Sequence, residues 1–263
     1  MERIGFDFMC TGEQHHTYHI GALINGYVSE LHLDQSCEFN SQLKDDLSIT
    51  EVHYHSKSEL KKLFLKLLLR REKLSVVGIS SKSLIWLTPL TILGRRIEIH
   101  VHGQIAGINN PWKRVFWKFS SIFFSIVVGN PIYSGPRFIK NIGNVGSFQY
   151  LSKPPQMERL CILYGSNKSF LRDQFICGRI EGAGIPVEFS LSDEGYVSTN
   201  QIVKAVSQAT HTFLQLKLDH YLLSPSGRIC DLTIYDLKPL VLKEDVDTQT
   251  VLNNYGIHYM KIN

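Results

Sequence analysis

The chain has 263 residues, of which 43% are hydrophobic and 20% are charged, so it is long enough for one large domain or two small ones. This ordinary globular composition excludes a disordered or repetitive chain. The formal net charge of +4 suits an anionic ligand or a membrane surface, but it is too small to indicate a DNA-binding protein.

The five cysteines are widely scattered, and none of them forms a CxxC pair. Their spacing therefore favours neither a zinc site nor a disulfide framework, and a reducing cytosol is the simplest setting. The N-terminal residues lack the basic and apolar regions of a signal peptide. No apolar run reaches the roughly 20 residues that span a bilayer. We expect a cytoplasmic protein, with peripheral association at the inner face of the cell membrane left open.

Strands and helices are expected to alternate along the first half of the chain. Short apolar runs predict strands at 3–10, 47–54, 74–80, 95–103 and 125–130. Helical periodicity predicts helices at 15–24, 57–73, 81–94 and 111–124. Proline in the first turn marks the start of the last of these helices, at Pro111. This alternation indicates an α/β fold with mainly parallel strands.

A looser stretch rich in Gly, Ser, Pro and Asn follows at 141–156, and we expect the domain boundary at its end. The predicted domains are 1–153 and 154–263. The second half again predicts strands, at 158–165, 185–191, 211–218 and 239–243, and helices, at 166–184, 198–209 and within 224–241. Each half is expected to be a Rossmann-like unit, with ligands outside the carboxyl ends of the strands. Two such sheets facing each other would place the site in the cleft between them.

The segment 224–228, Ser-Pro-Ser-Gly-Arg, stands where the last of these helices is expected to begin. The hydroxyl of Ser224 or Ser226 is suited to capping the helix, and Gly227 allows a ligand to approach the backbone. Free amides at a helix N-terminus bind anions, and the Arg228 guanidinium suits phosphate oxygens. Plain helix capping is the alternative interpretation.

The longer segment 219–241, DHYLLSPSGRICDLTIYDLKPLV, resembles the donor-binding segment of GT-B glycosyltransferases, as in short family-4-like members. In these enzymes a Ser- and Gly-containing loop opens a helix, and a Gly- or Lys-Pro stretch leads to the next strand. The stretch IEIHVHG at 97–103 resembles a strand end in their N-terminal domain. The resemblance implies a nucleotide-sugar donor bound by the C-terminal domain, an acceptor on the N-terminal domain, and no required metal or other cofactor.

Many retaining members of this family carry two glutamates that flank the loop, with seven residues between them. The corresponding segment here offers only Asp219, Asp231 and Asp236. Asp231 lies eight residues before Pro239, one more than the usual spacing of the acidic residue. This departure leaves donor identity and stereochemistry undetermined.

Sugar transfer needs a base for the acceptor hydroxyl, and His, Asp or Glu serve at neutral pH. His102 ends an expected strand before Gly103, and it is the first candidate for the catalytic base. His16 and Glu13 follow the first expected strand and are the alternatives. The alternative for His102 is a structural histidine that bonds to the backbone at a strand end. The alternative for His16 and Glu13 is a solvated loop. No spacing of carboxylates or cysteines around His53 and His55 indicates a metal site.

The candidate donor-binding residues follow two strands of the second half. After the strand at 158–165, a diphosphate contact is expected from Lys168 and Arg172, which are four residues apart and share a helix face. A solvated helix surface explains them equally well. The full donor set is Gly165, Lys168, Arg172, Ser224, Ser226, Gly227, Arg228 and Asp231.

The helices at 57–73 and 111–124 combine apolar faces with Lys and Arg. Such helices rest on anionic bilayer surfaces, although packing against the sheet explains most of their apolar residues. A membrane face would suit a lipid-linked saccharide acceptor. We expect a glycosyltransferase of surface polysaccharide or lipid-linked glycan assembly. A catalytically silent partner with the same fold is the main alternative. A Rossmann-type dehydrogenase or epimerase would need a GxGxxG motif, which CTGEQHH at 10–16 does not supply.

Overall fold

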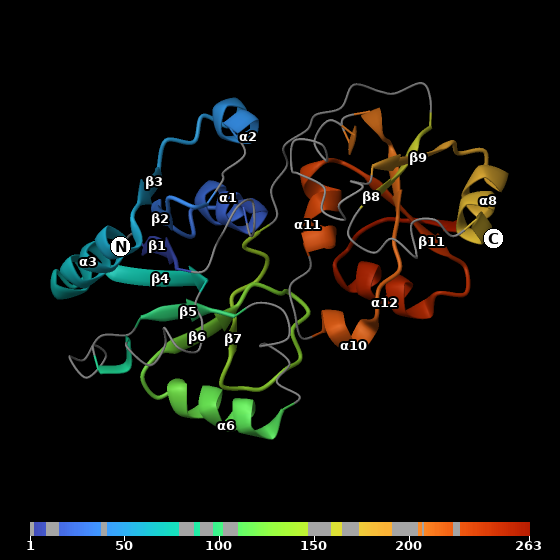
Figure 1. The fold of residues 1–263 in the computed structure, drawn as a ribbon. Coiled ribbons are helices and arrows are strands. Elements are labelled where there is room, and N and C mark those ends of the chain that lie inside the picture. The colour runs from blue at the N-terminus through green and yellow to red at the C-terminus, as the bar shows by residue number, and fades with distance from the viewer. Residues whose placement is uncertain are drawn as a thin grey trace. The chain divides into compact units, whose positions relative to one another are not determined.

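The computed structural model (Figure 1) describes residues 3–8, 16–37, 41–78, 87–89, 97–101, 110–146, 159–164, 174–190, 205–206, 208–222 and 227–263. The chain divides into two compact units. The first contains Met1–Gly146 and Leu222–Ser226, and the second contains Ser147–Tyr221 and Gly227–Asn263. The predicted domain boundary near residue 153 lies outside the described residues and stays a prediction.

The first unit is built on a seven-stranded sheet with the order β3-β2-β1-β4-β5-β6-β7. Every pair of neighbouring strands in it is parallel. The strands, drawn from blue to green in Figure 1, are β1 (Arg3–Asp7), β2 (Glu30–Asp34), β3 (Val52–His55), β4 (Lys73–Gly78), β5 (Glu98–His100), β6 (Ser125–Val128) and β7 (Lys140–Asn141). The described helices of this unit are α1 (His16–Ile24), α2 (Ser41–Asp46), α3 (Lys57–Leu69) and α6 (Pro111–Ser120).

Two of these helices share one apolar core with the sheet. Leu60, Phe64 and Leu68 of α3 and Trp117 of α6 are buried in a cluster with Phe6, Val76, Ile99 and Ile126 of the strands. Alternate strand residues point to opposite faces. The intervening positions, such as Asp7, Ser75 and His100, are buried as well, so the opposite face of the sheet is also covered. A parallel sheet covered on both faces is typical of doubly wound α/β folds.

The second unit is built on a five-stranded parallel sheet with the order β12-β11-β10-β8-β9. Its strands are β8 (Cys161–Tyr164), β9 (Val187–Ser190), β10 (His211–Phe213), β11 (Lys238–Leu242) and β12 (Met260–Ile262). Its described helices are α8 (Gln174–Gly182), α10 (Leu218–Tyr221), α11 (Gly227–Ile234) and α12 (Val246–Asn254). The predicted fold class, α/β with two mainly parallel sheets, is confirmed.

The structure also corrects several predicted elements. The strand expected over 211–218 ends at Phe213, and the helix expected over 57–73 ends at Leu69. Neither β2, β7, α12 nor β12 was predicted. In β2, Leu31 and Leu33 alternate with His32 and Asp34, which is a strand pattern, and the prediction overlooked it; all four residues are buried.

Three histidines gather on neighbouring strands of the first unit. His32 of β2 is 6% exposed, and its Nδ1 lies 3.0 Å from Nε2 of His55 on β3. The His32 ring also stacks on His53, with 5.1 Å between ring centroids. The Glu30 carboxylate lies 3.6 Å from Nε2 of both His32 and His53. Burial lowers the pKa of His32 to about 4, with the two neighbouring histidines adding to the shift and Glu30 opposing it.

This cluster predicts that the protein loses stability in mild acid. Below pH 6.5, the ordinary pKa of histidine, the unfolded chain binds a proton at His32 that the folded chain does not bind until about pH 4. The free energy of unfolding should therefore fall as the pH falls through this window. Burial also lowers the pKa values of His100 and His211, which contribute in the same direction. Urea unfolding at a series of pH values measures the slope.

The variant His32→Gln removes the titrating ring and should make this slope shallower. His258→Gln is the matched control, because His258 is exposed, and it should leave the slope unchanged. Equal slopes in wild type and His32→Gln would show that folding does not change the pKa of His32.

Candidate functional site

The strand order of the first unit reverses between β1 and β4. From β1 the chain adds β2 and β3 on one side, and from β4 it adds β5, β6 and β7 on the other. In an open α/β sheet, ligands bind outside the carboxyl ends of the strands at such a reversal. Asp7 ends β1 at this edge, and α1 is the next described element of the chain.

Helix α1 is held to the end of β1 by a buried polar pair. Nε2 of His19 lies 2.9 Å from Oδ2 of Asp7, and their side chains are 1% and 0% exposed. A buried carboxylate without a hydrogen-bond partner would cost several kcal/mol. The pair therefore fixes the first turns of α1 against the carboxyl edge of the sheet.

A second contact joins α1 to β5. The Tyr18 hydroxyl lies 2.7 Å from Nδ1 of His100, and His100 is buried. Nε2 of His100 lies 2.7 Å from the Ser75 hydroxyl and 3.3 Å from a carboxylate oxygen of Glu98. The Tyr27 hydroxyl also donates to Glu98. This network runs from α1 across β4 and β5.

Burial lowers the pKa of His100, so we assign the neutral ring at pH 7. Nε2–H then faces Ser75 and Glu98, and Nδ1 accepts from Tyr18. Burial opposes ionisation of Glu98, but the hydrogen bonds from His100 and Tyr27 outweigh it and hold the Glu98 pKa below its ordinary value. Burial, together with the Glu98 carboxylate, raises the pKa of Tyr27. The network thus carries one negative charge at neutral pH, on Glu98.

Two glycines let the backbone close around α1. A Cβ on Gly21 would lie 2.5 Å from the carbonyl of Gly146, and a Cβ on Gly129, just after β6, would lie 2.9 Å from the Tyr18 hydroxyl. Asn25, the residue after α1, also donates to the Val145 carbonyl at 2.9 Å. The first turns of α1 are therefore fixed by β1 and β5, and its later turns by the segment after β7.

The predicted catalytic residues follow these same strands. His16 is the first residue of α1. Glu13 and His102 lie outside the described residues, in the segments that follow β1 and Val101. His100, two residues before His102, is buried in the polar network and acts as a structural group. Because the strands are parallel, the segments after β1 and β5 leave the sheet at one edge, with β4 between them.

The second unit reverses its strand order between β8 and β10, which are hydrogen-bonded neighbours. The chain leaves β8 at Tyr164 and β10 at Phe213, so both connections begin at the same carboxyl edge. The first leads to the predicted residues Gly165, Lys168 and Arg172, which lie outside the described residues. The second leads through α10 to the predicted segment 224–231.

Helix α11 begins at Gly227, within the Ser-Pro-Ser-Gly-Arg segment that predicted a helix start. Arg228 and Asp231 lie in its first two turns and are partly buried. Ser224 and Ser226 precede the helix and lie outside the described residues. The structure therefore places Gly227 and Arg228 at the start of α11 and Asp231 one turn further along it, on the connection that leaves the sheet at its strand-order reversal.

Helix α12 holds the start of this connection. The Thr248 hydroxyl accepts a 2.7 Å hydrogen bond from the Leu216 amide, and the Asp247 carboxylate accepts from the Leu218 amide at 3.3 Å. Asp245 caps α12 by accepting from the Thr248 amide. Sequence reasoning missed these residues, although an aspartate directly before a helix, here Asp245, is a recognisable capping signal.

Within the described ranges, no group of three or more His, Cys, Asp or Glu residues is arranged to hold a metal ion. In the same part of the chain, no helix is long and apolar enough to cross a membrane.

No protein-family model matches the chain, and no curated protein matches it by sequence. Three similar solved structures are glycosyltransferases. The calicheamicin glycosyltransferase CalG4 has a TM-score of 0.42 and 7% identity, with 99% of this chain and 86% of that one covered. MurG of Acinetobacter baumannii has a TM-score of 0.44 and 8% identity at the same coverage. The kitacinnamycin glycosyltransferase has a TM-score of 0.43 and 9% identity, with 100% and 86% covered.

The contact between Tyr18 and His100 yields a stability prediction. Tyr18→Phe removes the hydroxyl and leaves Nδ1 of His100 buried without this donor, which should lower the free energy of unfolding by about 1–3 kcal/mol. Urea unfolding measures the change. Tyr54→Phe is the matched control, because Tyr54 is 40% exposed, and it should change stability by less than about 0.5 kcal/mol. Equal effects of the two substitutions would contradict the assigned role of the network.

Proposed function

We propose that the protein is a GT-B-type glycosyltransferase that moves a sugar from a nucleotide-sugar donor to a saccharide or lipid-linked acceptor. The observation that carries the proposal is the position of α11. Its N-terminus bears Gly227 and Arg228, and it lies on the connection that leaves the five-stranded sheet at its strand-order reversal.

The second unit is the proposed donor side. A helix N-terminus presents free amides and a partial positive charge to phosphate oxygens. The Arg228 guanidinium adds a charge-assisted hydrogen bond to the phosphate. Asp231 lies one turn further along α11, and we propose that its carboxylate accepts a hydrogen bond from a hydroxyl of the donor. Gly165, Lys168, Arg172, Ser224 and Ser226 complete the proposed set, because they follow the neighbouring strand or precede the helix.

The first unit is the proposed acceptor side. In the reaction, the bond between the sugar carbon and the diphosphate oxygen breaks, and a bond from that carbon to the acceptor oxygen forms. The acceptor proton passes to a base, for which we propose His102, with His16 and Glu13 as alternatives. The two contacts that fix α1 give His16 a rigid backbone position, as a site that orients a substrate requires.

The finer assignment is hexosyl transfer in surface polysaccharide or lipid-linked glycan assembly, without a required metal or other cofactor. Its support is the resemblance of segment 219–241 to the donor-binding segment of these enzymes.

A catalytically silent binding partner with the same fold is the second candidate. The specific observation in its favour is that segment 219–241 contains three aspartates, Asp219, Asp231 and Asp236, where many retaining enzymes have a glutamate pair. Nucleoside-diphosphate release from a panel of nucleotide sugars, with and without saccharide acceptors, separates the two. Acceptor-dependent release supports transfer, and donor binding without release supports the silent partner.

The proposed base predicts a kinetic effect. His102→Ala should lower the rate of transfer by about 10²–10⁴-fold, because a positioned base contributes that much, while donor binding stays close to wild type. Steady-state rates and calorimetric donor binding provide the two readouts. Near-normal turnover in this variant would remove His102 from the role.

The proposed diphosphate site predicts a selective loss of affinity. Arg228→Ala should weaken nucleoside-diphosphate binding by about 10- to 150-fold, since hydrogen bonds to charged groups contribute roughly 1.5–3 kcal/mol. Binding of the free nucleoside should change far less, because it lacks phosphates. Calorimetric titration of both ligands makes the comparison.

Arg70→Ala is the control for net charge, because Arg70 is an exposed arginine of the first unit, and it should leave both affinities unchanged. Equal losses for nucleoside and nucleoside diphosphate in Arg228→Ala would indicate a folding defect. No loss for either would mean that the segment is only a capped helix.

A further inference from the structure

Helix α6 carries an apolar stripe on its solvent side. Trp112, Val115, Phe119 and Ile122 are 82%, 61%, 57% and 70% exposed. The first three lie on α6 and Ile122 follows in the turn at its end, where its amide donates to the Phe119 carbonyl. Spacings of three, four and three residues place all four side chains on one side of the helix. We call these four residues the α6 stripe.

The α6 stripe is separate from the side of α6 that packs on the sheet. Trp117 and Ser120 are the buried residues of the helix, and Trp117 belongs to the apolar core of the first unit. Packing of α6 therefore needs Trp117 and leaves the stripe unexplained. A contiguous group of exposed, large apolar side chains usually marks an interaction surface.

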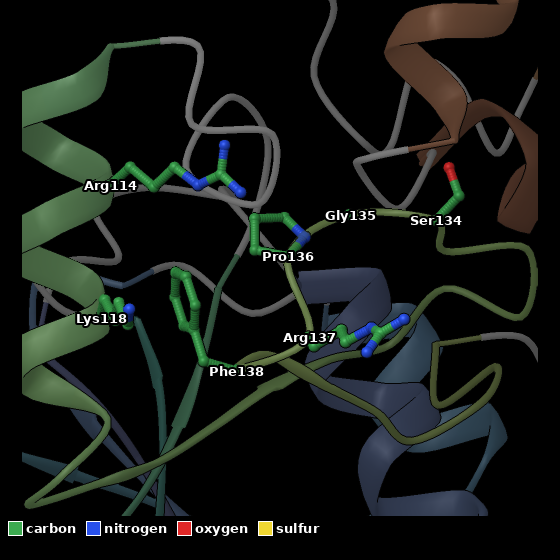
Figure 2. A pocket seen from close by; sticks show the side chains of 7 residues that line it. All are labelled: Arg114, Lys118, Ser134, Gly135, Pro136, Arg137 and Phe138. Carbon is green, nitrogen blue, oxygen red and sulfur yellow. The ribbon is translucent and has the colours of Figure 1, made fainter.

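Cations lie beside the stripe. Arg114 and Lys118, four residues apart on α6, line a cavity of about 750 Å³ together with Ser134, Gly135, Pro136, Arg137 and Phe138. Figure 2 shows Arg114 and Lys118 extending from α6 beside Pro136 and Phe138, while Arg137 extends from the other side of the 134–138 loop. No acidic side chain lines the described cavity, and α6 itself contains none.

We propose that the α6 stripe and this cavity form a docking surface for an anionic lipid bilayer. The stripe enters the region between headgroups and acyl chains, and Arg114, Lys118 and Arg137 contact lipid phosphates. The proposal deepens the proposed function by naming the surface on which a lipid-linked acceptor is reached. It does not depend on sugar transfer, because vesicle binding is measured without donor or acceptor.

The pattern of residues favours a bilayer over a protein partner. Exposed aromatic and aliphatic residues lie on one side of α6, and every charged residue of this helix is Lys or Arg. Helices that lie in a membrane interface have this arrangement. Three cations, with no carboxylate among the described residues that line the cavity, match the negative charge of a lipid surface. The chain's formal net charge of +4 acts in the same direction.

The first experiment is co-sedimentation of the full chain with vesicles of phosphatidylcholine alone and of phosphatidylcholine with phosphatidylglycerol. Wild type should bind the anionic vesicles, and less so as salt is added. The Trp112→Ala/Phe119→Ala variant should bind at least about 10-fold more weakly, because two large apolar side chains no longer leave water. Arg114→Gln/Lys118→Gln should lose roughly 5-fold per charge, on anionic vesicles only.

The matched control is Phe175→Ala. Phe175 is an exposed aromatic residue of the second unit, at 66%, so its loss should leave vesicle binding unchanged. Fluorescence gives a second readout in a Trp86→Phe background, because of the two remaining tryptophans Trp112 is exposed and Trp117 is buried. Anionic vesicles should shift the tryptophan emission to shorter wavelength in this background, and adding Trp112→Phe should remove most of the shift while retaining binding.

Three outcomes overturn the proposal. The first is no binding to either kind of vesicle, and the second is equal binding by wild type and the stripe variant. The third is a concentration-dependent dimer in sedimentation velocity that Phe119→Ala abolishes, which would assign the stripe to a second copy of the chain. If the wild-type protein binds anionic vesicles but transfers no sugar, only the proposed function is contradicted.

Discussion

The parallel direction of every paired strand is the constraint on which the rest of the structure depends. Parallel strands place all their carboxyl ends at one edge of a sheet, so connections that are distant in sequence begin side by side. In the first unit this edge receives the segments after β1 and β5, which contain Glu13, His16 and His102. In the second unit it receives the segments after β8 and β10, which contain the proposed donor-binding residues. Two groups of candidate residues thus arise from topology, before any side-chain contact is considered.

Hydrogen bonds then fix the connections that matter. Asp7 and His100 hold the first turns of α1 through His19 and Tyr18, and Thr248 and Asp247 hold the segment between β10 and α10. In both units a polar residue of a helix satisfies groups at the carboxyl edge of the sheet. These contacts restrict the backbone beside the candidate residues, and orientation of this kind is what a transfer reaction requires of its enzyme. The α6 stripe, Arg114 and Lys118 lie on another helix, so the proposed surface binding and the proposed chemistry would use different parts of the first unit.

Much of the fold could be predicted because apolar patterns and capping residues act locally. Pro111 marked the start of α6, and the Ser-Pro-Ser-Gly-Arg segment marked the start of α11. β2 was missed although Leu31 and Leu33 alternate with His32 and Asp34; its sequence does not show that the polar face is buried too, because the contacts of His32 and Asp34 come from other residues. The strand at 211–218 was predicted too long because the Leu216 amide bonds to Thr248 instead of to a neighbouring strand. The pairs Asp7–His19 and Tyr18–His100 were not predictable either, since their partners meet only once the sheet has formed.

The most direct measurement of the central claim is a crystal structure of the protein with a nucleoside diphosphate. The diphosphate is predicted at the carboxyl edge of the five-stranded sheet. Its oxygens should lie within hydrogen-bond distance of the amides at the start of α11 and of the Arg228 guanidinium, with Asp231 on the same side of the ligand. A diphosphate bound away from α11, or bound only to the first unit, would contradict the account.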